Sequence, residues 1–116
     1  MSPLGISRIA AVVLALVAAP ALHAADAGDA AAGMRKNTMC IGCHGIPGYK
    51  TAFPDVYSVP KLGGQQAAYI AKALQAYKAG DRSHPSMRAI AAGLSEQDMA
   101  DLAAYYAADA VKAAAK

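Results

Sequence analysis

Apolar residues recur at three- and four-residue intervals in two segments of the chain, a pattern that predicts helices with one buried face. The segment 65–79 is followed by Gly80, a residue suited to the position just after a helix. A later helix is predicted to begin after Ser95 as N-cap, and Asp98 occupies the acidic position of a capping box. The two apolar stripes comprise Ala67, Ile70, Ala71, Leu74 and Tyr77, and Met99, Leu102, Ala103, Tyr106 and Ala110.

A third helix is predicted over residues 29–39, where Asp29 can serve as N-cap. Residues 45–64 follow it and hold three prolines without an alternating strand pattern, so they are predicted to form a long irregular loop. Pro85 disfavours continued helix in the segment 80–87. The pattern therefore predicts an all-α fold class, with three main helices joined by long loops.

Residues 1–25 have the three-part pattern of an export signal. Arg8 precedes an apolar run of 11 residues, 9–19, and small residues follow it. This run is shorter than the roughly 20 residues that cross a bilayer as a helix, so cleavage between Ala21 and Ala25 is favoured over a retained anchor. We therefore expect a removed signal peptide at 1–25, one domain at 26–116, a location in the periplasm and no stable membrane span.

The expected mature chain is small and weakly charged. Removing residues 1–25 of the 116 leaves 91 residues, enough for one domain with a modest core. The formal charge falls from +3 to +2 with the loss of Arg8. Such a small charge gives no reason to expect nucleic-acid binding.

The only two cysteines stand in the sequence Cys40-Ile41-Gly42-Cys43-His44, which is the attachment signature of a c-type haem. Thiols three residues apart on a helical turn can reach both vinyl groups of one porphyrin, and His44 lies one turn from Cys40 and can bind the iron. A thiol-disulfide protein is the rival interpretation, because exported cysteine pairs tend to oxidise. That class expects a βαβ setting, which the sequence does not show. One covalently attached haem c is therefore the expected cofactor.

The second axial position of the iron decides between electron transfer and ligand chemistry. Met87 is favoured for this position, because it lies 43 residues beyond His44 and the chain can round the ring over that length. His84 is the competing ligand, although a solvated loop residue is the preferred interpretation of it. Met34 and Met99 are expected to pack in the core. An iron that is open on this side is the third alternative.

The chain resembles the class I c-type cytochromes, and most closely one haem domain of the dihaem periplasmic members and their small monohaem relatives. The resemblance covers roughly residues 29–108, through the cysteine motif and the segments 59–65, 69–80, 87 and 93–106. It implies the small cytochrome c fold, in which helices and long loops wrap around one covalently bound haem. With a single Cys-x-x-Cys-His motif, the chain is expected to carry one haem.

The resemblance also implies roles for individual residues. Cys40 and Cys43 would form the two haem thioethers. His44 would be the proximal iron ligand and Met87 the distal one. An iron held on both faces favours electron transfer over catalysis, so the protein is not expected to be an enzyme.

Further roles around the haem follow from the same resemblance. The Pro60 carbonyl would accept a hydrogen bond from the proximal histidine and so fix the orientation of its ring. Leu62 would pack on the haem. Gly33 and the region of Leu102 and Tyr105 would form a crossing of the terminal helices.

The function expected from these residues is that of a monomeric periplasmic electron carrier, which docks briefly with redox protein partners. Four lysines could ring the haem edge and steer acidic partners: Lys50, Lys61, Lys72 and Lys78. The main alternative is a haem-bearing electron-transfer subunit of a larger oxidoreductase complex, with the same ligands but a permanent partner. An enzyme or gas sensor with an open iron site is a further alternative.

Overall fold

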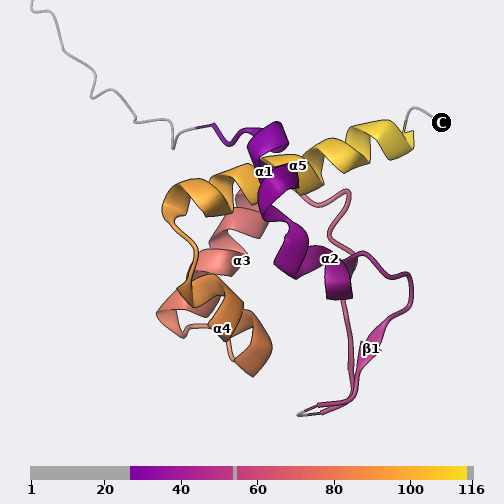
Figure 1. Ribbon diagram of the computed structural model, residues 1–116, viewed down its shortest axis with the longest axis vertical. Helices are drawn as coiled ribbons and strands as arrows, with labels where there is room; N and C mark the ends of the chain where they lie inside the picture. The colour runs from indigo at the N-terminus through magenta and orange to yellow at the C-terminus, as the bar shows by residue number, and fades with distance from the viewer. Residues whose placement is uncertain (1–26, 54, 115–116) are drawn as a thin grey trace, which may run out of the picture.

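The structure is a computed structural model that describes residues 27–53 and 55–114, with side chains as far as residue 108 (Figure 1). The predicted signal peptide at 1–25 lies outside these residues. In chain order the elements are α1 (Ala30–Lys36), α2 (Thr38–His44), β1 (Lys50–Thr51), β2 (Tyr57–Ser58), α3 (Ala67–Ala79), α4 (Pro85–Ala92) and α5 (Glu96–Ala114). The described chain is thus almost entirely helical outside its loops, as the hydrophobic pattern predicts.

Helix α1 crosses α5 at close range, and Figure 1 shows the two helices one in front of the other. An ideal Cβ atom at Gly33 would lie 2.1 Å from the carbonyl oxygen of Asp101 and 2.7 Å from Cβ of Tyr105. Gly28 approaches the carbonyl of Ala100 in the same way. Only a residue without a side chain fits at these points. The predicted crossing of the terminal helices at Gly33 is therefore confirmed.

Asp101 is buried at this crossing, and its carboxylate joins three parts of the chain. Oδ2 accepts a hydrogen bond of 2.6 Å from Lys36 Nζ, and Oδ1 accepts bonds of 2.8 Å each from the Asp29 backbone and Gln97 Nε2. These donors, with Lys36 first, lower the pKa of Asp101 to about 2. Lys36 also pairs with Asp98 at 2.7 Å. The end of α1 is thus tied to the first turns of α5 by the charge of Lys36, and its start by the backbone N–H of Asp29.

Asn37 separates α1 from α2 and is buried. Its Oδ1 accepts a hydrogen bond of 2.9 Å from the Tyr106 hydroxyl, which fixes the side chain against α5. Its backbone carbonyl accepts from the N–H groups of Cys40 and Ile41, at 2.8 and 3.0 Å, and so starts α2. The helix predicted over 29–39 is therefore two helices, and the second one continues through the cysteine motif to His44.

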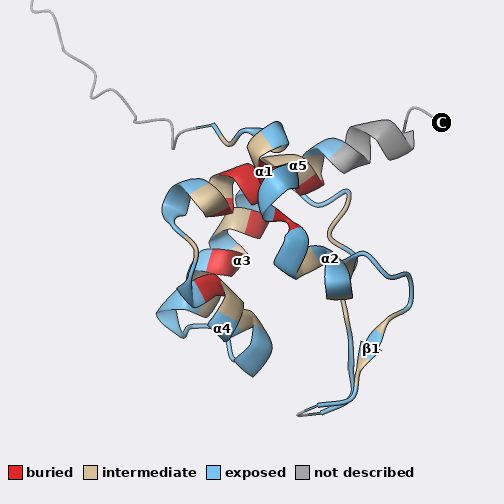
Figure 2. Cartoon of the chain, viewed as in Figure 1, coloured by how far each residue is buried: buried red, intermediate tan, exposed pale blue. Residues whose placement is uncertain are grey.

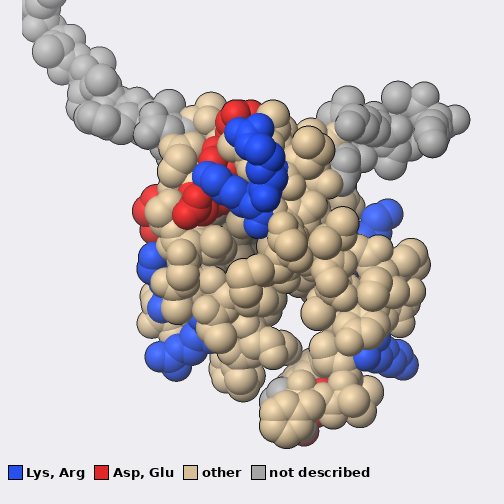
Figure 3. Space-filling view, in the orientation of Figure 1, with Lys and Arg blue, Asp and Glu red and all other residues tan. Residues whose placement is uncertain are grey.

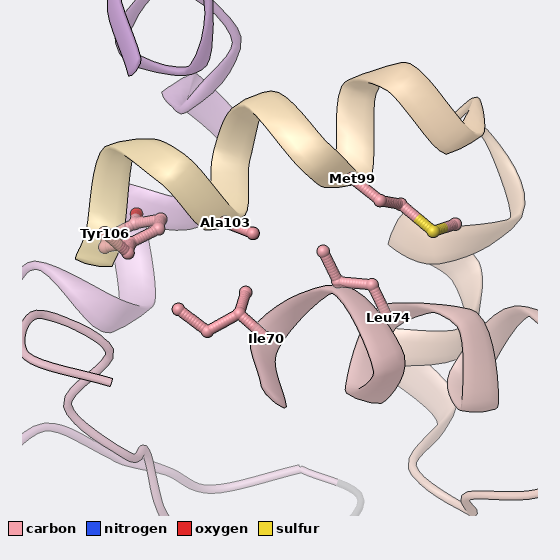
Figure 4. Packing of buried hydrophobic residues seen from close by; sticks show 5 residues of the cluster. All are labelled: Ile70, Leu74, Met99, Ala103 and Tyr106. Carbon is pink, nitrogen blue, oxygen red and sulfur yellow. The ribbon is translucent and has the colours of Figure 1, made fainter. Parts of the chain in front are cut away.

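The hydrophobic core lies mainly between α3 and α5. Figure 4 shows Ile70 and Leu74 pointing from α3 toward α5. The central cluster comprises Ile70, Leu74, Met99, Ala103 and Tyr106. The helix ends follow the predicted signals: Gly80 has a left-handed φ of 89° after α3, and Ser95 and Asp98 exchange backbone hydrogen bonds of 2.9 and 3.1 Å before α5. Figure 2 shows the buried residues gathered mainly where α1, α3 and α5 meet, with a further buried residue, Ala91, in α4.

The two methionines expected in the core differ in their surroundings. Met99 is fully buried, so the prediction for it is confirmed. The prediction for Met34 is wrong, because 59 % of this residue is exposed. Helix α1 ends after two turns at Asn37 and contacts α5 along the face of Gly33, which leaves Met34 on the solvent side.

Helix α4 and the β1–β2 pair are not predicted by the sequence pattern. Pro85 occupies the first turn of α4, where no intrahelical N–H is needed and its fixed φ suits the helix. In the predicted irregular loop, Lys50 pairs with Ser58 and Thr51 with Tyr57 in an antiparallel ladder. Two-residue strands are too short to show alternation, which explains why this hairpin was not foreseen. Figure 1 shows it extending away from the helices.

Candidate functional site

A cavity of about 460 Å³ lies between α2, β2, α3 and the start of α4. Its volume is within the range of roughly 300–1,000 Å³ that is typical of cofactor and small-molecule sites. Figure 3 shows a hollow on this face of the molecule, between the helices and the hairpin. All six residues that the sequence nominates for haem binding line the cavity: Cys40, Cys43, His44, Pro60, Leu62 and Met87.

Helix α2 presents the cysteine motif to the cavity on one face. Cys40, Cys43 and His44 are three and four positions apart within the helix, the spacing that places side chains side by side. Both thiols are free and half-buried. Burial raises the pKa of the Cys40 thiol, although a hydrogen bond with Tyr106 acts in the opposite direction. A thiol used in disulfide exchange needs a lowered pKa, so this environment speaks against the thiol-disulfide interpretation.

The His44 imidazole is fixed by the loop that precedes α3. Its Nδ1 lies 2.6 Å from the carbonyl oxygen of Pro60. A carbonyl can only accept, so Nδ1–H donates this bond, and in the neutral ring the lone pair remains on Nε2. This is the tautomer that a metal-binding histidine needs, held by the kind of partner that orients such ligands.

Met87 lines the cavity from the first turn of α4. The backbone N–H of Met87 donates to Nδ1 of His84, at 3.3 Å, and His84 is the N-cap of the helix. The His84 ring also packs against Tyr57 of β2 in an edge arrangement, with centroids 5.3 Å apart. The interpretation of His84 as a solvated loop residue is therefore wrong: the residue is half-buried and has two specific contacts.

The lining fits a covalently held haem. Ile70, Leu74 and Leu102 belong to the buried interior and also face the cavity, so a flat apolar ring would extend the core there. The cavity walls supply two thiols, the His44 imidazole with a free Nε2, and the thioethers of Met39 and Met87, which are the donor types that c-type haem attachment and axial ligation use. The residues present thus match both the apolar and the coordinating requirements of the group.

Sequence reasoning did not place Tyr57 or Arg82 in the cavity wall, and it considered His84 as a competing ligand without foreseeing its role as N-cap of α4. Arg82 lies over the ring of Tyr77, with its guanidinium carbon 4.7 Å from the ring centroid. The signal that could have pointed to His84 is its place immediately before Pro85, because the residue before an N1 proline is the N-cap. Nothing local in the sequence marks the contact with Tyr57, since the two residues are brought together only by the fold.

The four lysines predicted to surround the haem edge have different environments. Lys61 lines the cavity, and Lys50 is exposed on β1. Lys72 is exposed on α3, whereas Lys78 donates a hydrogen bond to the backbone carbonyl of Leu94 and so ties α3 to the loop before α5. Figure 3 shows basic side chains at the flanks of the face with the hollow, and most acidic atoms near the α1–α5 crossing.

None of the helices in the described part of the chain combines the length and the hydrophobicity that a membrane span requires.

Comparison with known proteins gives consistent matches. The family model described as Cytochrome c matches residues 30–107. Cytochrome c-554(548) of Halomonas halodenitrificans is 45 % identical over 83 residues, which cover 69 % of this chain and 95 % of that protein. Cytochrome c4 of Pseudomonas aeruginosa is 43 % identical over 81 residues, which cover 70 % of this chain but 38 % of that protein. Cytochrome c4 of Azotobacter vinelandii is 42 % identical over 89 residues, which cover 69 % of this chain and 40 % of that protein. The matched part of the chain spans nearly all of the first relative and less than half of each cytochrome c4.

Proposed function

Since the chain belongs to the cytochrome c family of electron-transfer proteins with covalently attached haem c, we propose that it is a periplasmic carrier of one electron at a time. One observation carries this proposal: two thiols, an imidazole with a free Nε2 and a thioether line a single cavity in the apolar interior. When bound there, haem supplies an iron that cycles between ferric and ferrous states. The protein residues hold, orient and shield this group.

The proximal side of the site is assigned to helix α2. Cys40 and Cys43 form the thioethers, and His44 binds the iron through Nε2. The hydrogen bond from His44 Nδ1 to Pro60 supports this assignment, because it fixes the ring plane and makes the imidazole a stronger donor. Leu62, which packs against the core cluster and lines the cavity, covers the ring on this side.

Met87 is assigned as the distal ligand. Its place on the first turn of α4 and its contact with the core cluster support this role. His84 is the weaker candidate, because its Nδ1 already accepts from the backbone of Met87. A thioether ligand raises the reduction potential, so the carrier favours the reduced state. His44 and Met87 would together hold the haem iron and keep substrates away from it, which would leave electron transfer as the chemistry of the group.

Replacing Met87 by alanine tests the distal ligand directly. We expect Met87→Ala to lose the weak long-wavelength absorption band of ferric iron–methionine bonding and to lower the reduction potential. Met34→Ala is the matched control: Met34 is 59 % exposed, so its replacement leaves the band and the potential unchanged. A band that persists in Met87→Ala would move the ligand role to another residue.

Electrons reach protein partners at the cavity mouth, and we assign a steering role to Lys61, which lines the cavity, and to Lys50, which is exposed on β1. Such a pair attracts an acidic partner and raises the association rate at low salt. Electron transfer to the partner is expected to slow as ionic strength rises, and less so in Lys61→Glu. A rate that is independent of ionic strength in the unmodified protein would refute the steering role.

The proposed carrier is exported, processed between Ala21 and Ala25, and monomeric. Mass spectrometry of protein purified from the periplasm is expected to show a chain shortened by 21 to 25 residues, with the mass of one haem added. Gel filtration is expected to show a small free species. Elution with a permanent partner would support the alternative of an electron-transfer subunit in a larger oxidoreductase.

A further inference from the structure

The second strand of the hairpin reaches the residue that caps the helix of Met87. The ring of Tyr57 meets the ring of His84 edge-on, with an interplanar angle of 67° and centroids 5.3 Å apart. His84 in turn accepts the hydrogen bond from the Met87 backbone at 3.3 Å. Tyr57, His84 and Met87 therefore form a continuous line of contacts along the cavity wall, which all three residues line.

The choice of histidine at the cap is itself informative. Serine, threonine, aspartate and asparagine are the preferred N-caps, and a serine stands one position earlier, at 83. A hydroxyl or carboxylate could accept a hydrogen bond from the Met87 N–H, but such a side chain has no ring that could pack against Tyr57. Histidine at position 84 provides a cap and an aromatic surface with one side chain.

The same strand leads to the proximal side of the site. Three residues after Tyr57, the carbonyl of Pro60 accepts the hydrogen bond from His44. The segment 57–60 thus contacts the support of the proposed distal ligand at one end and the proposed proximal ligand at the other. We call this segment the strap.

We propose that Tyr57 and His84 are positioning residues for Met87, and that the strap keeps the first turn of α4 closed so that the thioether stays on the iron. The inference rests on the proposed function, because it takes Met87 as the distal ligand. Removing the Tyr57 ring leaves the cap without its lateral support. The first turn of α4 then opens more often, and Met87 leaves the iron more often.

Binding of free imidazole to the ferric holoprotein measures this opening, because imidazole can bind only when Met87 has left. We expect Tyr57→Ala to lower the apparent dissociation constant for imidazole by roughly two- to tenfold, the range that one aromatic pair supplies. His84→Asn keeps a capping oxygen and loses the ring, so it is expected to match Tyr57→Ala. The double variant is expected to bind imidazole no more tightly than either single variant, because both substitutions remove the same contact.

Two control variants separate the contact from general effects. Tyr57→Phe keeps the ring and is expected to bind imidazole as the unmodified protein does. Phe53→Ala removes an aromatic side chain from the same hairpin, but Phe53 is 84 % exposed, so no change is expected. Tyr57 is 51 % exposed and lies outside the core cluster, so its replacement leaves the interior intact.

The outcomes distinguish the strap from the ligand assignment. A ferric holoprotein without the iron–methionine band overturns both proposals. A holoprotein that has the band, but in which Tyr57→Ala and Phe53→Ala bind imidazole equally, overturns the strap alone. Additive effects of Tyr57→Ala and His84→Asn would also overturn it, because they would show that the two rings act independently.

Discussion

Helices α1 and α5 approach each other closely at Gly33, and replacing this glycine by alanine should destabilise the protein. Alanine is the better helix former, by about 1 kcal/mol, so the local effect of Gly33→Ala on α1 is favourable. The tertiary effect is opposite, because the new methyl group would lie 2.1 Å from the Asp101 carbonyl oxygen. The prediction therefore sets helix propensity against packing in one substitution.

The magnitude follows from the rigidity of what the methyl group meets. The obstacle is backbone of α5 together with Cβ of Tyr105 at 2.7 Å, and neither can rotate away. Helix α1 would have to move by about an ångström, and overpacking of this kind costs about 1–3 kcal/mol. The shift would also stretch the bonds from Lys36 and Asp29 to Asp101. After the gain in propensity is subtracted, we expect a net loss of about 1 kcal/mol, or about 4–8 °C in Tm for a domain of this size.

Denaturant and thermal unfolding of the ferric holoprotein, followed by far-UV circular dichroism, measure this loss. Gly93→Ala is the matched control, because the nearest atom to a Cβ there is 3.8 Å away and the backbone φ is −85°. We expect Gly93→Ala to leave the midpoint nearly unchanged. If Gly33→Ala were as stable as the unmodified protein, or more stable, the close α1–α5 contact would be refuted.

Three further predictions concern the buried polar groups and the cofactor. The pKa of Asp101 is lowered to about 2. Its pairing with Lys36 therefore stabilises the folded state at pH values above the ordinary carboxyl pKa of 3.8, and this contribution is lost as the pH falls toward 2. Acid unfolding of Asp101→Asn should show a weaker pH dependence in this window. Tyr106→Phe leaves the Asn37 oxygen without its donor and should cost about 1–2 kcal/mol in denaturant unfolding, whereas the exposed Tyr69 tolerates the same change. Protein prepared without haem should show reduced helix content by circular dichroism, because the cavity of about 460 Å³ would leave the core open.

Local signals in the sequence were sufficient for the elements that depend on local chemistry. The cap at Ser95 and the stop at Gly80 each depend on a few neighbouring residues, and both lie where predicted. Pro85 was misread, because a proline that blocks helix in the interior also suits the first turn of a new one. The break at Asn37 could not be foreseen either, since it depends on a hydroxyl from Tyr106, 69 positions away.

The candidate site was predictable to a similar degree. The spacing within the cysteine motif specifies one face of one helical turn, and the length of chain beyond His44 favoured Met87. The resemblance to a known family supplied Pro60 and Leu62. The contact between Tyr57 and His84 could not be predicted, because it depends on a two-stranded hairpin that carries almost no periodic signal. A loop that lacks a pattern can still adopt a defined structure when its ends are fixed by the elements around it.

The pairing of α1 with α5 has a consequence for the order in which the domain can form. The hydrogen bond from Asp29 to Asp101 joins positions 72 residues apart, so the first helix has no partner until the last one has been synthesised. Contacts of this separation carry a larger loop-closure entropy and slow folding. We expect the nascent chain to remain open through most of its synthesis, a state compatible with transport through a narrow channel, and the thiols of Cys40 and Cys43 to be most accessible during that interval.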